Sequence, residues 1–317
     1  MKVAFVGKGG SGKTTLTALF ARHLAERGLP VIAIDADINQ QLGVALGLDE
    51  DAAARLPAMG EHLDLIKDHL RGSNPRIASA AAMLKTTPPG RGSRLIRVAE
   101  DNPISERLER VVDGVRLMVT GPFAESDLGV ACYHSKTGAV ELYLNHLLDG
   151  AGEYVVVDMT AGADSFASGL FTRFDLTVLV AEPTRQGVAV HRQYTDYARD
   201  FGVAVRVLGN KVADDEDAAF LADRVGPALL TSLAPSPFVR ALERGRHRPF
   251  SELEPATRAA LDQLLAEVDA TPKDWPRFSR QTVEFHVRSA QAWGNAQMGF
   301  DLTTQIDPEF VLDPIPA

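Results

Sequence analysis

Short apolar segments recur along this chain, and most of them end at a glycine or at a charged residue. Lys2–Val6 and Val31–Ile34 have the length and composition of buried parallel strands. Between them, Thr14–Arg27 carries leucine and phenylalanine at helical spacing, and Gly28 follows as a helix stop. A strand, a glycine-rich loop, a helix and a second strand form one βαβ unit, which predicts a right-handed crossover and a parallel sheet.

The remainder of the chain continues this alternation. Further strands are predicted at Val115–Val119, Tyr154–Val157, Leu176–Val180, Val203–Leu208 and Ala228–Leu233. Helices are predicted between several of them, at Gly138–Leu148, Val188–Phe201 and Asp214–Val225. The pattern predicts an α/β fold with a doubly wound, mostly parallel sheet that is flanked by helices on both faces.

Two segments depart from this alternation. Asp49–Asn102 mixes alanine-rich helical pieces with prolines and glycine, and we interpret it as a helical insertion over the active face. From Thr271 onward the chain is rich in proline and contains both tryptophans. We expect residues 1–270 to form one domain and residues 271–317 to form an extension packed on it.

Composition restricts the kinds of partner. The net charge of −9 does not favour coating of nucleic acid or of an anionic membrane. One basic cluster departs from this balance, and its ordinary interpretation is a solvated helix end. The cluster comprises Arg240, Arg244, Arg246, His247 and Arg248. The charge therefore does not favour DNA as a partner, although this cluster keeps the alternative open.

Location follows from other features of the sequence. The single cysteine, Cys132, excludes an intrachain disulfide framework and fits a reducing compartment. No uncharged apolar stretch of about 18 residues predicts a membrane span. The apolar start of the chain turns polar at Lys8, which is too short for a signal peptide. The sequence thus predicts a cytoplasmic protein without a membrane partner.

The glycine loop after the first strand carries the clearest chemistry. Residues 7–15 satisfy the pattern G-x-x-x-x-G-K-[ST] through Gly7, Gly12, Lys13 and Thr14. Glycines let successive backbone N–H groups point at phosphate oxygens, and the following helix adds its positive end. Lys13 is then expected to reach the β- and γ-phosphates, and the Thr14 hydroxyl to bind Mg²⁺.

The same loop also spells G-x-G-x-x-G through Gly7, Gly9 and Gly12, the fingerprint of a dinucleotide site. Asp35 even lies near the position of the acidic residue in that fingerprint. Lys13 and Thr14 favour the P-loop, because a triphosphate with Mg²⁺ requires a cation and a hydroxyl there. A NAD-dependent enzyme remains a distant alternative.

With Lys8 included, the loop resembles the deviant Walker A motif KGGxGK[ST] of the MinD/ParA class of ATPases. In that class the extra lysine, here Lys8, reaches across a dimer interface to the partner's nucleotide, much as an arginine finger does. The resemblance covers most of residues 1–270. It implies that the loop binds the nucleotide through Gly9, Gly10, Ser11, Gly12, Lys13, Thr14 and Thr15.

Later segments extend the resemblance. It implies that Asp35 supports the Mg²⁺ shell and that Asp37 positions the attacking water, although one of them could simply cap the next helix. Asp158 ends an apolar strand in the Walker B manner, which implies a contact with Mg²⁺ through water. Gly162 corresponds to the second switch and would give its N–H to the γ-phosphate.

A further motif corresponds to the base site of this class. Asn210, followed by Lys211, matches its adenine-reading asparagine, because an amide can pair with both N6 and N7 of adenine. An ordinary turn asparagine is the alternative.

Within this class the chain resembles the CooC-type ATPases that mature nickel-containing carbon monoxide dehydrogenase. Asp35–Leu42 and Ala45–Leu48 carry that likeness. Those proteins have a CxC motif that binds metal across the dimer, whereas this chain has Cys132 and His134 in its place. Two copies would form a Cys₂His₂ site suited to Zn or Ni, but a single free cysteine is often only a small buried residue.

We therefore predict a Mg²⁺-dependent ATPase that binds and slowly hydrolyses ATP to ADP as a homodimeric switch. Lys8, Lys13 and Asp37 are the predicted catalytic residues. Two outputs stay open at this point. One is maturation of a metalloenzyme through an unknown client protein, and the other is a ParA-like positioning or scaffold function with a protein or DNA partner.

Overall fold

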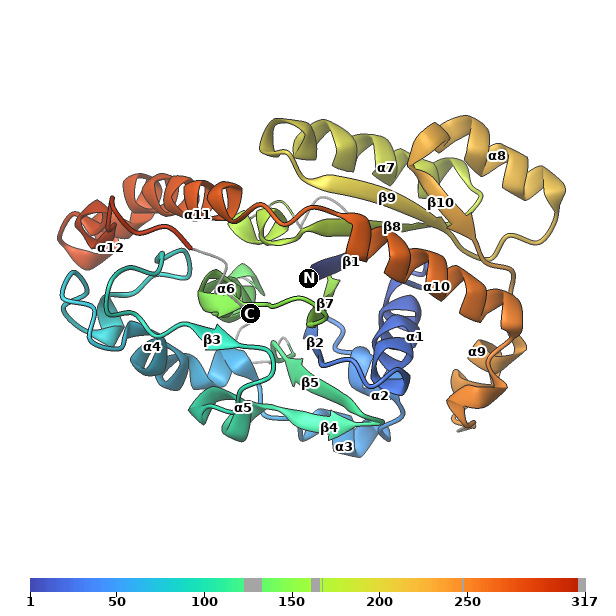
Figure 1. The fold of residues 1–317 in the computed structure, drawn as a ribbon, viewed down its shortest axis with the longest axis horizontal. Helices are drawn as coiled ribbons and strands as arrows, with labels where there is room; N and C mark the ends of the chain where they lie inside the picture. The colour runs from blue at the N-terminus through green and yellow to red at the C-terminus, as the bar shows by residue number, and fades with distance from the viewer. Residues whose placement is uncertain (123–132, 161–165, 167, 247, 313–317) are drawn as a thin grey trace.

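The computed structural model describes residues 1–122, 133–160, 166, 168–246 and 248–312, and it has an eight-stranded sheet at its centre (Figure 1). The strand order is β10-β9-β8-β1-β7-β2-β5-β4. All neighbouring strands pair in parallel except β4, which is antiparallel to β5. The strands are β1 Lys2–Gly7, β2 Val31–Ala36, β4 Arg110–Val112, β5 Val115–Val119, β7 Tyr154–Met159, β8 Leu176–Ala181, β9 Ala204–Gly209 and β10 Leu229–Ser232.

The central strands are buried on both faces, because successive side chains point into two different cores. In β1, Val3 and Phe5 pack toward one face, and Ala4 and Val6 toward the other. The first face is covered by α1 Lys13–Glu26 and α10 Pro255–Ala270. The second face is covered by α6 Tyr133–His146, α7 Arg185–Ala198 and α8 Asp215–Val225. The predicted doubly wound α/β fold is confirmed.

Two small features were not predicted. β4 forms a hairpin with β5 through Asp113 and Gly114, both at positive φ, as a tight turn requires. The helix predicted to reach Leu148 ends at His146, and the next two residues form β6 Leu147–Leu148, which pairs with β3 Ile96–Arg97. Two-residue strands leave no periodicity in a sequence, so only the tertiary pairing reveals them.

The segment expected to be a helical insertion contains two short α-helices and two 3-10 turns, and it packs mainly against α6. Its elements are α3 Glu50–Ala54, the 3-10 turns Met59–His62 and Ala80–Ala82, α4 Leu63–Arg71 and β3, preceded by α2 Leu42–Leu46 and followed by α5 Pro103–Leu108. Ile66 and Leu70 of α4 join the core that contains Leu142 and Tyr143 of α6. Ala58 bridges to Val119, which places the start of the segment at the carboxyl end of β5.

The C-terminal part of the chain lies along the body (Figure 1). After α9 Pro237–Leu242 and α10 it contains α11 Trp275–Ser289, a π-helical turn Ala290–Gly294, α12 Asn295–Met298 and a 3-10 turn Leu302–Gln305. Other 3-10 turns in the described part of the chain are Gly169–Arg173, Arg199–Phe201, Gly226–Ala228 and Phe250–Glu252. Gln305 donates to the Ala82 carbonyl at 2.8 Å, and Arg91 pairs with Asp307 at 2.9 Å. No helix in the described part of the chain is long and apolar enough to cross a membrane.

Candidate functional site

The glycine loop joins β1 to α1 at the carboxyl edge of the sheet. Gly10 and Gly12 have φ angles of 84° and 91°, a region that favours glycine. Gly7 is required for a different reason: a Cβ there would lie 2.6 Å from Ser11 Oγ and 2.7 Å from the Val180 carbonyl oxygen. The loop is thus curled tightly at its base, where a side chain at position 7 would have no room.

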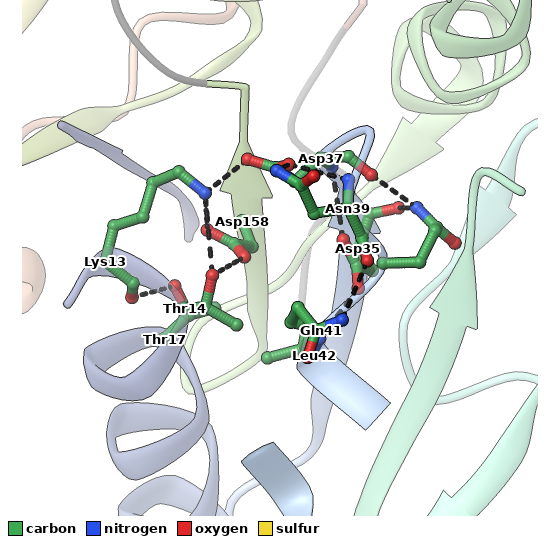
Figure 2. Close-up of polar contacts among 10 residues, drawn as sticks. Lys13, Thr14, Thr17, Asp35, Asp37, Asn39, Gln41, Leu42 and Asp158 are labelled. Carbon is green, nitrogen blue, oxygen red and sulfur yellow. Dashed lines mark hydrogen bonds and ion pairs between the residues drawn. The ribbon is translucent and has the colours of Figure 1, made fainter. Parts of the chain in front are cut away.

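Lys13 and Thr14, at the start of α1, face the end of β7 (Figure 2). The Lys13 ammonium contacts the Asp37 carboxylate and lies 3.2 Å from Asp158 Oδ1. The Thr14 hydroxyl donates to Asp158 Oδ2 at 2.5 Å. The tertiary structure therefore brings together four side chains that lie up to 145 positions apart in the sequence.

Asp35 and Asp37 have different neighbours, although they are only two positions apart. Asp35 is completely buried, and its carboxylate accepts N–H bonds from Asp37 at 3.1 Å and Leu42 at 2.8 Å. Asp37 Oδ1 accepts from both nitrogens of Asn39, at 2.9 and 3.0 Å. Asp35 thus holds the loop after β2 in place, while that loop aims Asp37 at Lys13.

The carboxylates of the site are buried near one another, so it is unfavourable for all of them to be ionised together. Asp35 and Asp158 are register partners across β2 and β7, so their side chains share one face of the sheet. Burial raises the pKa of Asp35, and the charge of Asp158 raises it further. Burial also raises the pKa of Asp158, even though Lys13 opposes this. For Lys13, the two acids outweigh burial and raise its pKa. A second cation near Asp35 and Asp158 would therefore be favoured.

This donor set fits Mg²⁺ shared with phosphates. The Thr14 hydroxyl and the Asp158 and Asp35 carboxylates are oxygen ligands of the kind that Mg²⁺ prefers. Among the described residues, no group of three or more His, Cys, Asp or Glu side chains could hold a metal ion. Mg²⁺ usually completes its shell with water and substrate oxygens, so this side-chain set is the one expected for a nucleotide-bound ion.

Asn210 and Lys211 lie on the other side of the glycine loop, directly after β9. The Asn210 amide donates to the Ser11 carbonyl at 2.8 Å, and Lys211 donates to the Gly10 carbonyl at 2.7 Å. Beside them is a pocket of about 240 Å³ that Gly12 and Asn210 share with Leu233 and Pro235. A half-apolar pocket with one amide, next to the phosphate loop, is suited to a nucleobase.

A larger surface groove of about 940 Å³ lies between α7 and α8. It contains none of the loop residues and is open and rich in arginine, including Arg192 and Arg224. Because a nucleobase must lie within reach of the phosphate loop, the smaller pocket is the candidate base pocket.

Lys8 is exposed and does not join the Lys13 cluster. Its ammonium contacts Gln186 in the first turn of α7. Lys211 pairs with Glu182 at 2.6 Å. Glu182 therefore borders the glycine loop through Lys211.

Several contacting residues had no distinctive sequence signal. Gln40 has a φ of 49°, donates to the Asp37 carbonyl at 2.6 Å and accepts from the Gly121 N–H at 3.1 Å. Gln40 lies in the CooC-like stretch Asp35–Leu42, but no role was predicted for it. Gln186, Glu182 and the loop at 233–236 belong to no motif. Only the chain's return to the carboxyl edge of the sheet could have identified them.

Other predicted residues cannot be placed in the site. Cys132 and Gly162 lie outside the described residues, and of His134 only the backbone, in α6, is described. In the basic cluster, His247 is also outside the described part, Arg248 pairs with Glu252 at 2.7 Å, and Arg240 borders the base pocket. These assignments stay predictions.

Comparison with known proteins gives the context for this geometry. The profile of the CobQ/CobB/MinD/ParA nucleotide-binding domain matches residues 3–228, which contain the glycine loop, Asp35, Asp37, Asp158 and Asn210. This chain is a member of the CobQ/CobB/MinD/ParA family. The predicted resemblance is confirmed, and the chain is a nucleotide-binding protein.

Individual relatives of this family member differ in function. The carbon monoxide dehydrogenase accessory protein CooC of Rhodospirillum rubrum is 29% identical over 269 residues, which are 84% of this chain and 95% of CooC. An uncharacterized ATP-binding protein of Methanocaldococcus jannaschii is 28% identical over 228 residues, which are 70% of this chain and 79% of that protein. The septum site-determining protein MinD of Pyrococcus horikoshii, solved with Mg-ADP, has a TM-score of 0.55 and 19% identity over 85% of this chain and 97% of that one. The structural likeness supports the fold.

Proposed function

We propose that this MinD/ParA-family protein is a Mg²⁺-dependent ATPase that works as a nucleotide-dependent homodimeric switch in the maturation of a metal-containing enzyme. The observation that carries the proposal is the contact of Lys13 and Thr14 with Asp37 and Asp158 at the base of the glycine loop. These side chains supply the cation, the hydroxyl and the carboxylates that phosphoryl transfer requires.

Each residue has a role that follows from its surroundings. Phosphate oxygens in the loop would compete with Asp37 for the Lys13 ammonium. Thr14 and Asp158, with Asp35 beside them, would hold Mg²⁺, which neutralises charge on the transferring phosphoryl group. Released from Lys13, the Asp37 carboxylate would stay oriented by Asn39 and could accept a hydrogen bond from the attacking water.

The position of Lys8 supports action in a dimer. Its ammonium is exposed and contacts Gln186, away from the carboxylates of its own protomer. A second protomer facing the loop could receive this lysine at its phosphates, in the manner of an arginine finger. Gly162 would contribute its N–H to the same γ-phosphate. Slow turnover fits a protein whose output is a change in partner affinity.

The biological assignment is supported by the likeness to CooC along 84% of this chain. Cys132 and His134 would bind a transition metal such as Zn or Ni at the dimer interface, with two residues from each protomer. The client would be the enzyme that receives the metal.

Oligomeric state measured with ATP and with ADP tests the switch. Size exclusion with light scattering should show that Asp37→Ala is trapped as a dimer by ATP and stays monomeric with ADP. The added Lys8→Ala change should abolish the trapped dimer. If ATP leaves wild type, Asp37→Ala and the double variant in the same oligomeric state, the switch is refuted.

Metal analysis tests the maturation role. The ATP-bound dimer should bind about one Zn²⁺ or Ni²⁺ per two chains, and Cys132→Ser should abolish this binding. Absence of stoichiometric metal would eliminate this role. The ParA-like alternative predicts instead ATP-dependent, salt-sensitive retention on DNA, which charge reversal at Arg244 and Arg246 would remove.

A further inference from the structure

One wall of the base pocket is a short loop between β10 and α9. This loop, residues 233–236, supplies Leu233, Ala234, Pro235 and Ser236 to the pocket. Its start is fixed to the sheet, because Leu233 donates to the Gly209 carbonyl at 2.8 Å and accepts from the Val212 N–H at 3.0 Å. The far end of the loop has no strand to pair with, so another contact must set its position.

Glu254 makes that contact from outside the pocket. Its Oε2 accepts from the Ser236 hydroxyl at 2.7 Å, and its Oε1 accepts from the Phe238 N–H at 2.9 Å. The Ser236 Oγ in turn accepts from the Val239 N–H at 3.0 Å, which caps the start of α9. One carboxylate thus holds both the end of the pocket loop and the first turn of the next helix.

The carboxylate is itself held firmly. Glu254 immediately precedes α10, a helix of 16 residues that packs against α1. This packing anchors the backbone of Glu254. Burial alone would raise the pKa of Glu254, but bonds from the Phe238 N–H and the Ser236 hydroxyl lower it. The side chain is therefore ionised at neutral pH, and hydrogen bonds to an ionised acceptor are about twice as strong as neutral ones.

We propose that Glu254 is a positioning residue for the nucleobase: it clamps residues 233–236 against the Asn210 side of the pocket and so sets the width of the base site. The inference rests on the proposed binding of ATP. Glu254 does not line the pocket, so it acts through the loop that it holds.

The clamp also affects base selection. Asn210 donates to the Ser11 carbonyl, which fixes one end of its amide and leaves the carbonyl oxygen to accept from the 6-amino group of adenine. Discrimination against the 6-oxo group of guanine requires the base to be held at that amide. A loosened loop would let the base move away, so both affinity and the preference for ATP over GTP would fall.

The experiment distinguishes binding of the nucleobase from binding of the phosphates. Affinities of the full chain for ATP, GTP and Mg-tripolyphosphate, which has no base, are measured by competition with fluorescent ADP. Glu254→Ala should lower the affinity for ATP about tenfold, because it removes charge-assisted hydrogen bonds. The affinity for tripolyphosphate should stay unchanged. Glu254→Gln keeps an acceptor oxygen and should recover most of the loss.

Two further variants sharpen the result. Ser236→Ala should lower the affinity for ATP. The double variant with Glu254→Ala should lose little more affinity than either single variant, because both substitutions remove the same contact. Glu252→Ala is the matched control, since that glutamate pairs with Arg248 on the surface and should not change ATP affinity.

Two results would overturn the clamp: unchanged ATP affinity in Glu254→Ala, or an equal loss of tripolyphosphate binding, which would mean general damage. Failure of wild type to bind ATP would instead refute the proposed function on which the clamp rests.

Discussion

The buried ion cluster at Lys13 offers a test that does not depend on activity. Lys13, Asp37 and Asp158 have side chains that are 8%, 6% and 0% exposed. Lys13→Met keeps the length of the side chain but removes the cation, so the acids lose the ammonium between them. Breaking a buried pair in this way typically destabilises a protein by about 3–5 kcal/mol. We expect a loss of this size in the nucleotide-free protein at pH 8.

The loss of stability caused by Lys13→Met should grow as the pH rises. Burial already raises the pKa of Asp158, and without Lys13, which opposes this, its folded-state pKa lies still further above the unfolded value of about 4. The folded state then binds more protons than the unfolded state. The stability of the variant therefore decreases as the pH rises from the unfolded-state pKa to the folded-state pKa. Asp158 already has a pKa raised to about 6, so the difference from wild type should be clearly smaller at pH 6 than at pH 8.

Urea unfolding of both proteins at the two pH values measures this directly. Lys211→Met is the matched control, because Lys211 also contacts the glycine loop but pairs with Glu182 at the surface with half of its side chain exposed. A surface pair of this kind contributes less than about 1 kcal/mol. A Lys13→Met penalty no larger than that of the control, or equal at both pH values, would refute the reasoning.

Three other substitutions have outcomes that follow from the geometry. Gly7→Ala should lower the free energy of unfolding by about 1–3 kcal/mol in denaturant titration, because the new Cβ would lie 2.7 Å from the Val180 carbonyl oxygen; unchanged stability would contradict this. Lys8→Ala should slow ATP hydrolysis by about 10³-fold or more in a phosphate-release assay, while stability changes by less than about 0.5 kcal/mol, and hydrolysis at the wild-type rate would exclude action in trans. Asn210→Ala should lower the affinity for ATP about tenfold in calorimetry and leave the affinity for tripolyphosphate unchanged. Equal losses of both affinities would show that Asn210 supports the loop instead of the base.

Much of this protein could be predicted from local sequence. The apolar strands and the helix after the glycine loop were predicted because a buried strand or an amphipathic helix leaves its own periodicity in the chain. β5 was predicted with its exact bounds, and β7, β8 and β9 to within two residues at each end. The residues from Lys8 to Thr14 were recognisable because a phosphate loop needs glycine, lysine and hydroxyl at fixed spacing.

Other features depended on contacts between distant parts of the chain. β3 and β6 are too short to carry a pattern, and each exists because the other lies beside it. Gln186 and Glu254 are ordinary polar residues in sequence, and they matter only because α7 and α10 bring them to Lys8 and to the loop at 233–236.

The sequence by itself therefore determined the fold class and the chemical nature of the site, since both are written in local residue types and spacing. The tertiary structure decided how the charges are distributed. It paired Lys13 with Asp37 and Asp158, left Lys8 exposed and turned Asp35 into a backbone anchor. The physical reason is that the energy of a charge depends on its burial and on neighbours within a few ångströms, and these come from strands and helices far apart in the chain.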